Sequence, residues 1–486
     1  MSTADRRRPA GVDANRWLVL GICSSALFIV GLDVSGLNLA LPSIQSQLQV
    51  SASNLQWTLD AYTLVVAGLL MLSGSIADRV GRRRIFRLGL VLFGVGSLLC
   101  AFATSGADLI ASRAVQAVGG SMLTPVAMSI ITTTFTDPRE RAQAIGVWGG
   151  TIGVSMALGP LIGGVLVETV GWRGIFWMNV PVVLLALALS ARYVPESRAE
   201  RRRPLDPIGQ LLIMTALLTL TFAIIEGRGA GWTSPLVLGC ALAFAVSLSA
   251  FVVVGRRMTY PLIDPAFFAS LPFSGAVISA VIGFACQGGF LLLNTLYLQS
   301  ARGFSPLHAG LLTLPMAVCT AVGAPISGRL VGSSGVRTPM LVAAFGIGGS
   351  ALILTRITLE TPVTALMVAY VLFGFGFGML NTPITNSAVS GMPIGQVGVA
   401  SAVASTSRQV GTALGVAMFG TLTFGAMAPG GSGTWADPGE LAAASHPAWW
   451  VMLGCAVALG AVAFLVTSPA AARSLQRVNV KMGQSS

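Results

Sequence analysis

Charged residues are scarce in this chain. Aspartate, glutamate, lysine and arginine make up 9% of its 486 residues, whereas 54% of the residues are hydrophobic. Soluble domains average about 25% charged residues, so the composition excludes an ordinary soluble domain. Long apolar stretches are present instead, and about 20 mostly apolar residues suffice for one membrane-spanning helix. The sequence therefore predicts an all-α integral membrane protein.

Histidine and cysteine provide no recognisable metal or catalytic centre. The two histidines, His308 and His446, are too few for a histidine-based zinc or catalytic cluster. All six cysteines fall inside apolar stretches, where we expect packing residues rather than disulfides or metal ligands. The sequence also contains no nucleotide-binding loop and no nucleophile–base pair. These absences argue against an enzyme, against ATP as the energy source and against a cofactor.

Fourteen apolar segments are long enough to cross a membrane, and the loops between them are too short for a soluble domain. The predicted spans are residues 17–41, 54–76, 84–104, 108–132, 142–167, 173–193, 208–226, 233–254, 272–298, 306–328, 338–357, 362–384, 400–425 and 447–468.

The charges that remain are distributed unevenly. With fourteen spans, 23 of the 29 cationic residues fall on the side of the two termini, four fall on the opposite side and two lie deep within spans, if residues at span ends are counted with the adjoining loop. Cationic loops stay in the cytoplasm, so we expect a multi-pass protein of the cell membrane with both termini cytoplasmic. The net charge of +12 thus reflects topology and gives no reason to expect a nucleic-acid partner.

An internal repeat predicts two halves. Gly74 and Gly81 are followed two residues later by an arginine, and Gly328 and Gly335 repeat this pattern in a corresponding inner loop. Two six-helix halves of the same orientation would produce such a repeat. A charged linker that begins at Glu196 is expected to be solvated and to precede two inserted helices. The expected parts are a tail (1–15), a first half (16–195), the linker and inserted helices (196–260), a second half (261–470) and a tail (471–486).

Three charged residues lie deep inside the predicted spans of the first half, away from the span ends. Asp33 and Asp60 lie roughly 10 Å below the outer surface and Arg113 about 8 Å below it, at 1.5 Å per residue. A charge at membrane depth needs a partner or a function. We predict a cavity in which Arg113 neutralises a carboxylate and Asp33 or Asp60 takes up a proton. The alternative is a static ion pair with one carboxylate at the membrane edge.

The loop after the second span, GSIADRVGRRR, and Arg87 three residues beyond it place Asp78 among five arginines. A carboxylate in this position can bind arginines and helix N-termini. A plain cationic inner loop would explain the arginines but neither Asp78 nor the glycines, so we predict a latch for the cytoplasmic side. Its residues are Gly74, Asp78, Arg79, Gly81, Arg82 and Arg83.

The fifth span is rich in glycine at a helical spacing. Gly159 and Gly163 are four residues apart, Pro160 lies between them, and four further glycines share one face nearer the start of the span. Small residues at this spacing let helices approach closely. The glycines of this span serve either ordinary tight helix packing or a flexible contact at which the two halves rotate relative to one another.

Polar residues within apolar spans are the candidates for a substrate cavity. They are Asn38, Trp57, Gln116, Asn179, Gln287, Asn294, Asn381 and Arg408. Arg408 has no acid in the spans of its own half, so it extends toward the inner surface, meets carbonyl oxygens, or lines the cavity and contacts the substrate.

Several of these stretches resemble the major facilitator superfamily, in particular its fourteen-helix drug:proton antiporters. Asp33 in LDVSGLNLALP is similar to that family's first-helix aspartate, and GSIADRVGRR to its signature between the second and third helices. Arg113 and Gln116 are similar to its fourth-helix signature, although Ala117 stands where the family has glycine. GVSMALGPLIGG resembles the fifth-helix antiporter signature, which then comprises Gly153, Gly159, Pro160, Gly163 and Gly164.

The resemblance implies two six-helix halves plus two inserted helices, and proton-coupled efflux of lipophilic drugs or antibiotics. A proton gradient would supply the energy, with no cofactor and no metal. The expected partners are a small lipophilic substrate, protons and the lipid bilayer, and a monomer is expected. Some multidrug members carry an acid where Ser407 and Arg408 stand here, which argues against export of multivalent cations.

A proton-coupled uptake symporter of a small solute is the alternative, because the same fold serves both directions. The fifth-span signature and the few polar residues in the spans favour export of an apolar substrate.

Overall fold

The computed structural model describes residues 10–198, 206–258, 263, 265–390, 397–426 and 438–481, and all regular structure in these ranges is helical. The first half consists of α1 (Ala10–Leu48), α2 (Ala52–Val80), α3 (Arg82–Ala101), α4 (Gly106–Thr134), α5 (Pro138–Thr169) and α6 (Arg173–Tyr193). The inserted pair is α7 (Pro207–Ala230) and α8 (Pro235–Arg257). The second half consists of η1 (Pro265–Ala269), α9 (Leu271–Thr295), the π-helical turn η2 (Leu296–Ala301), α10 (Pro306–Ser334), α11 (Arg337–Leu354), α12 (Val363–Val389), α13 (Val397–Ala426), α14 (Pro438–Ala444), α15 (His446–Val466) and α16 (Pro469–Lys481).

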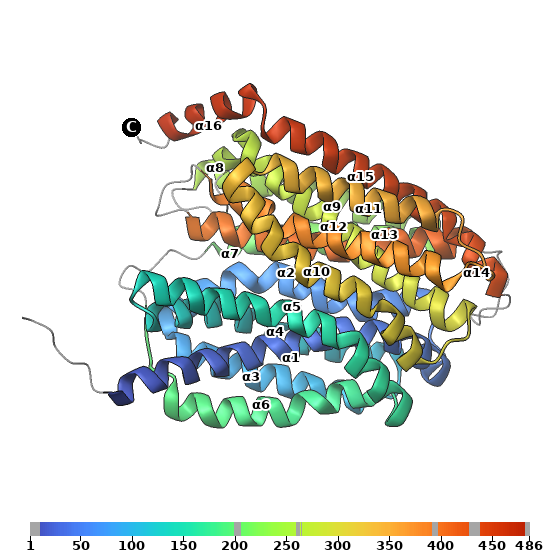
Figure 1. Cartoon of the computed structure of the whole chain (residues 1–486), viewed down its shortest axis with the longest axis horizontal. Helices are drawn as coiled ribbons and strands as arrows, with labels where there is room; N and C mark the ends of the chain where they lie inside the picture. Colours follow the sequence, from blue (N-terminus) through green and yellow to red (C-terminus); the bar gives the residue numbers. More distant parts are fainter. Residues whose placement is uncertain are drawn as a thin grey trace, which may run out of the picture.

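The helices form two bundles, with α1 to α6 in one and α9 to α15 in the other (Figure 1). Among the described residues, thirteen helices are long and apolar enough to cross a membrane, and α5 contributes the apolar segment Leu158–Thr169. The predicted all-α membrane fold is therefore confirmed. The inserted α7 packs against α2 of the first half and α13 of the second.

The start of α1 and the end of α16 lie at the same end of the molecule (Figure 1). We call this the inner end, because the arginine-rich segments lie there, and the opposite end the outer end. Much of the predicted C-terminal tail is helical, since α16 runs to Lys481 and packs against α9 and η1.

Short polar side chains fix where several spanning helices begin. The hydroxyl oxygens of Ser51, Ser105, Ser234 and Ser305 each accept a hydrogen bond from the backbone N–H three residues later, at the starts of α2, α4, α8 and α10. These caps satisfy N–H groups that have no partner within the helix. Apolar runs therefore begin directly after a polar residue at the membrane surface.

A shared hydrophobic core joins the two halves near the outer end. It contains Leu37 and Ile44 of α1 together with Phe290 of α9 and Tyr370 of α12. The inner part of the first half has a separate core around Phe86, in which all the described members belong to α1 to α6 or their connections. Burial of apolar surface thus ties the halves together near the outer end, and smaller apolar clusters join α2, α7 and α13 farther inward.

Hydrogen bonds cross the boundary between the halves at the same end. The Gln56 side-chain amide of α2 donates to the carbonyl oxygens of Val416 (3.1 Å) and Ala417 (3.0 Å) in α13. The Gln299 amide of η2 donates to the carbonyl oxygen of Leu39 in α1 (2.9 Å). Each contact fixes a backbone carbonyl of one half to a side chain of the other.

The helices α5 and α10 touch near the outer end and separate toward the inner end. A Cβ on Gly164 of α5 would lie 2.8 Å from the carbonyl oxygen of Pro306 in α10. Gly150 and Gly146 lie on the same face of α5, by the helical period, and no described atom lies within 4 Å of their Cβ positions. Gly328 near the inner end of α10 is equally open. The structure is therefore closed at the outer end and open between these helices at the inner end.

Gly164→Val should prevent the outer ends from closing, because the added side chain would meet the backbone of α10. Gly146→Val is the matched control, since its Cβ position is open. Spin labels at Ser46 and Glu360, one in each half, report the separation of the outer ends. We expect Gly164→Val to lengthen the distance and Gly146→Val to leave it unchanged. A wild-type distance in Gly164→Val would contradict the tight outer contact.

Candidate functional site

A buried ion pair lies inside the first half. The guanidinium of Arg113, from α4, donates through Nη1 to Oδ2 of Asp33, from α1, at 2.5 Å. The side chains are 1% and 0% exposed, respectively. The predicted pairing of Arg113 with a carboxylate is present, but the pair lies within the helix bundle and is closed to solvent. Burying two charges is tolerated only when both are paired and hydrogen-bonded.

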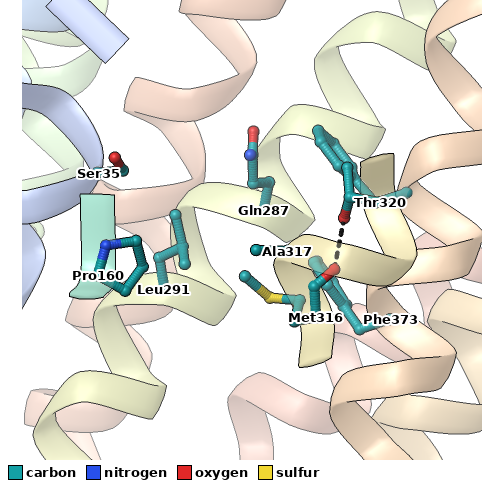
Figure 2. A pocket seen from close by; sticks show the side chains of 9 residues that line it. Ser35, Pro160, Gln287, Leu291, Met316, Ala317, Thr320 and Phe373 are labelled. Atoms are coloured by element: carbon teal, nitrogen blue, oxygen red, sulfur yellow. Dashed lines mark hydrogen bonds between the residues drawn. The ribbon is translucent and has the colours of Figure 1, made fainter. Parts of the chain in front are cut away.

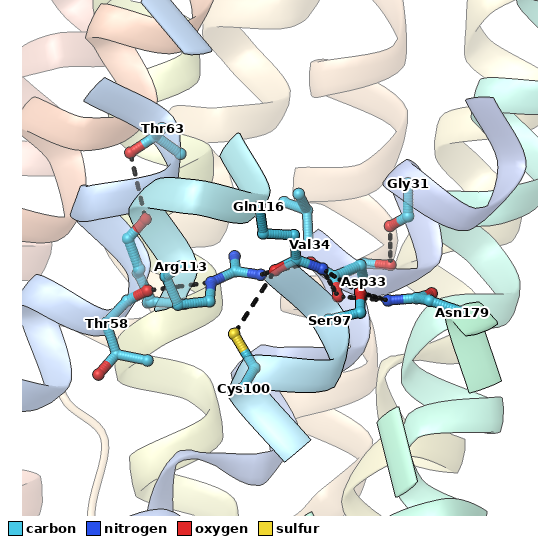
Figure 3. Close-up of polar contacts among 12 residues, drawn as sticks. Gly31, Asp33, Val34, Thr58, Thr63, Ser97, Cys100, Arg113, Gln116 and Asn179 are labelled. Atoms are coloured by element: carbon cyan, nitrogen blue, oxygen red, sulfur yellow. Dashed lines mark hydrogen bonds and ion pairs between the residues drawn. The ribbon is translucent and has the colours of Figure 1, made fainter. Parts of the chain in front are cut away.

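Neutral side chains complete the hydrogen bonding of Asp33. Its Oδ1 accepts from the amides of Gln116 (2.9 Å) and Asn179 (2.8 Å), and both amides also donate to the Ser97 hydroxyl oxygen, at 2.8 and 3.1 Å. Gln116 and Asn179 were predicted to line a cavity, and the structure places both inside this network (Figure 3). The network joins α1, α3, α4 and α6.

Aromatic rings and a carbonyl oxygen surround the rest of Arg113. Its Nε donates to the Thr58 carbonyl oxygen of α2 at 3.3 Å, and its Cζ lies 4.4 Å from the Tyr62 ring centroid and 5.9 Å from that of Phe176. A cation over an aromatic ring face is attracted by the ring's π electrons. The guanidinium therefore also ties α2 to the network.

Asp60 stands apart from this network. Its side chain is fully buried, and neither carboxyl oxygen accepts a hydrogen bond from a described residue. The neighbouring Thr63 hydroxyl donates to the backbone carbonyl oxygens of Leu59 and Asp60. Tyr62, which meets Arg113, is two residues away and lies about 200° around the helix from Asp60. Asp60 thus points away from Arg113, contrary to the expectation of one shared cavity.

The face of α2 that carries Asp60 is turned toward α13. Gln56 and Leu64 lie one turn to either side of Asp60 on that face. Gln56 donates to carbonyl oxygens of α13, and Leu64 shares an apolar cluster with Ala413 of α13. Asp60 therefore lies at the boundary between the halves, next to the outer closure.

The predicted latch residues gather at the inner ends of α2 and α3. Arg82 donates through Nε (3.0 Å) and Nη2 (2.8 Å) to Oδ1 of Asp78. Arg79 lies in the last turn of α2, and a Cβ on Gly74 would lie 3.7 Å from Cβ of Pro125 in α4. The contacts described for Asp78 stay within the first half, as expected when the inner end is open.

Glu196 joins this cluster, so the expectation of a fully solvated linker is wrong at its first residue. Its Oε1 accepts from the backbone N–H of Arg83 at 3.1 Å, and its Oε2 lies 3.9 Å from Nε of Arg83 and 3.6 Å from Nε of Arg84. A Cβ on Gly81, which has φ of +130°, would lie 2.6 Å from Oε1. The free N–H groups and the dipole at the start of α3 attract this carboxylate.

The fifth-span signature forms contacts on two sides of α5. Gly159 packs against Ser35 and Gly163 against Gly36, both in α1. The Pro160 carbonyl contacts Gly310 of α10, and Gly164 contacts the start of α10. Gly153 lies within α5, but its surroundings are outside the described part of the chain. The described glycines therefore let α5 approach α1 within its own half and α10 across the boundary.

The other cavity candidates occupy different surroundings. The Trp57 indole N–H donates to Oε1 of Glu226 in the inserted α7 at 2.9 Å. The Asn38 amide donates to the Val34 carbonyl oxygen in its own helix at 3.1 Å. Asn294 accepts a hydrogen bond from the Tyr370 hydroxyl within the second half.

A narrow pocket lies between the halves, below the outer closure, and includes the predicted residue Gln287 (Figure 2). Its lining is mostly apolar and comes from α1, α5, α9, α10 and α12. The lining residues are Ser35, Pro160, Gln287, Leu291, Met316, Ala317, Thr320, Phe373 and Phe377. Apolar walls with few polar groups suit a lipophilic molecule. Asn381 and Arg408 lie further inward, on α12 and α13.

Sequence inspection missed Ser97, Tyr62 and Glu196. Ser97 is a lone hydroxyl in an apolar span, and Tyr62 lies two residues from a predicted site residue, so both were visible as polar groups at membrane depth. The sequence positions of these two residues do not show which helix their side chains face. Glu196 carried no signal beyond its position at the end of a span.

Two half-bundles that close at one end around a narrow apolar pocket, the first of them held together by a buried ion network, define a multi-pass membrane transporter. Residues 23–416 match the model of the Major Facilitator Superfamily. The chain belongs to this family.

Relatives in this family carry the names of resistance proteins. The puromycin resistance protein of Streptomyces alboniger is 38% identical, over 86% of this chain and 84% of the relative. The multidrug resistance protein Stp of Mycobacterium tuberculosis is 35% identical, over 84% of this chain and 76% of its own length. The tetracenomycin C resistance and export protein of Streptomyces glaucescens is 32% identical, over 87% of this chain and 80% of the relative.

A solved structure has the same fold. It is a bacterial homologue of the human lysosomal transporter Spinster, in an inward-facing and unoccupied conformation. It aligns with a TM-score of 0.65 and 19% sequence identity, over 96% of this chain and 98% of the other.

The buried pair predicts a specific order of stabilities. Arg113→Gln should lower the free energy of unfolding by about 3–5 kcal/mol, because it leaves the Asp33 carboxylate buried without its cation. Asp33→Asn combined with Arg113→Gln should recover much of this loss. Thermal unfolding of the purified variants measures the order. A double variant no more stable than Arg113→Gln would show that the two charges do not stabilise one another.

Proposed function

We propose that the chain exports lipophilic drugs or antibiotics across the cytoplasmic membrane in exchange for protons, with both termini in the cytoplasm. The names of the relatives support export of such molecules, two of them being antibiotic resistance proteins and one a multidrug resistance protein. The apolar pocket between the halves supports a lipophilic substrate. The arginine-rich inner end supports the orientation.

Asp60 is the residue to which we assign the proton. A carboxylate that is buried without a cation or a hydrogen-bond donor is costly, and such a group becomes neutral by binding a proton. The single observation that supports this assignment is the absence of any described partner for both Asp60 oxygens, on a helix face turned to the other half. Separation of α2 from α13 at the outer end would bring water to this carboxyl and allow proton exchange.

Asp33 and Arg113 have a different role in this proposal. Their network provides the Asp33 carboxylate with one cation and two amide donors, which compensate the buried charge. The pair holds α1, α3, α4 and α6 together while the halves move, and Arg113 fixes α2 through Thr58 and Tyr62. The proton carrier and the structural ion pair are then separate groups.

An uptake symporter would use the same fold, and the direction of transport separates the two functions. Expression in an exporter-deficient bacterial host, with a panel that includes puromycin, should lower the accumulation of at least one compound. A protonophore should abolish this effect. Raised accumulation that depends on the proton gradient would instead indicate uptake.

Asp60→Asn should abolish proton movement that is driven by substrate in proteoliposomes, because the amide keeps the size of the side chain and cannot carry the proton. Glu226→Gln is the control, since it removes a neighbouring carboxyl on α7 that accepts a hydrogen bond from Trp57. Internal pH is recorded after substrate addition. Wild-type proton exchange in a folded Asp60→Asn variant would exclude Asp60 as the carrier.

A further inference from the structure

Arg408 is a membrane-embedded cation without a carboxylate partner among the described residues. It lies in α13, and the carboxylates described in the second half, Glu360 and Glu440, lie near the outer end. Arg113 of the first half, by contrast, binds Asp33 directly. Charged residues at membrane depth face the bundle interior or a water-filled cavity, and they commonly mark the pathway of a substrate or an ion. The charge of Arg408 therefore needs a different explanation from that of Arg113.

The described contacts of Arg408 satisfy only some of the N–H donors of its guanidinium. Nη2 donates to the hydroxyl oxygen of Thr385 in α12 at 2.6 Å, and Nη1 donates to that of Ser405 at 3.3 Å. Its Cζ lies 5.9 Å from the Phe284 ring centroid, at the outer range of such contacts. Nε is buried and donates to no described residue. Two neutral hydroxyls hold the side chain in place and leave its positive charge uncompensated.

Thr385, which binds Arg408, belongs to a polar face of α12. This face is directed across the space between the two halves at the inner end. Asn381, Thr385 and Asn386 are exposed there. The other sides of α12 pack against α9, α10, α11 and α13 of the same half, so this face is directed toward the first half. The inner ends of α5 and α10 are apart, which opens the space in front of it. Arg408 therefore lies beside the route from the inner end to the apolar pocket.

We propose that Arg408 is a specificity-determining residue that binds an anionic oxygen group of the substrate, such as a carboxylate or phenolate. This inference rests on the proposed export function and names its substrate class, a lipophilic molecule with one negative group. A planar guanidinium recognises a carboxylate through parallel N–H donors, and the bond is stronger where water is partly excluded. The apolar pocket beyond Gln287 would receive the rest of the molecule.

A matched pair of dyes tests this proposal: a rhodamine with a free carboxylate and its methyl ester. Both are titrated against the purified full-length chain in lipid nanodiscs, and binding is followed by fluorescence anisotropy. Wild type should bind the carboxylate dye more tightly than the ester. Arg408→Gln should weaken binding of the carboxylate dye about tenfold and leave the ester within about twofold, since one charge-assisted contact is lost. Arg408→Lys should retain part of the preference because it keeps the charge.

Arg302→Gln is the control for loss of a cation in the second half. Arg302 lies at the outer end, where it donates to the Tyr297 hydroxyl and the Thr361 carbonyl oxygen, and its replacement should leave the dye preference intact. Equal weakening of both dyes by Arg408→Gln would assign Arg408 a structural role and overturn the proposal. If wild type binds the ester as tightly as the carboxylate dye, the proposal for Arg408 is overturned as well. The proposed export function is not affected by that result. Failure of wild type to bind either dye, together with no efflux in cells, would count against export itself.

Discussion

The ion pair between Asp33 and Arg113 is the contact on which the first half depends. It lies where four helices meet, and amide and hydroxyl groups of Gln116, Asn179 and Ser97 saturate the carboxylate. Removing one member of such a pair leaves an uncompensated buried charge, which is far more costly than removing both. The helices that surround it are therefore expected to move as one body when the halves rearrange.

That rigid body gives Asp60 its role. Because Arg113 occupies one side of α2 through Thr58 and Tyr62, Asp60 is directed to the other side, against α13. The outer closure, through Gln56 and the glycines of α5, seals this boundary. A protonatable group at the seam between two rigid bodies changes its access to water whenever the seam opens. The placement of α2 between Arg113 and α13 thus accounts both for the charge pair inside the first half and for the proposed proton site at the boundary.

Much of the fold could be predicted from the sequence because apolar length, arginine distribution and the repeated loop are properties of the chain itself. That Arg113 pairs with a carboxylate could be predicted from the similar membrane depth of the three charges, but depth alone did not select Asp33 over Asp60. The helix that the Asp60 side chain faces could not be predicted, because it depends on the rotation of α2 about its axis relative to α4 and α13. Nor could the burial of Gln116 and Asn179 or the docking of Glu196 over Gly81, which require the distances between helices that are remote in sequence.

We propose that Asp60, and not Asp33, carries a proton in the closed outer state. Infrared difference spectroscopy on the full chain in lipid distinguishes the two residues, because a protonated carboxyl has a carbonyl stretch that is separate from carboxylate and amide bands. A proton-bearing carboxyl band should be present in wild type at neutral pH, persist in Asp33→Asn and vanish in Asp60→Asn. A band that vanishes in Asp33→Asn and persists in Asp60→Asn would contradict the claim.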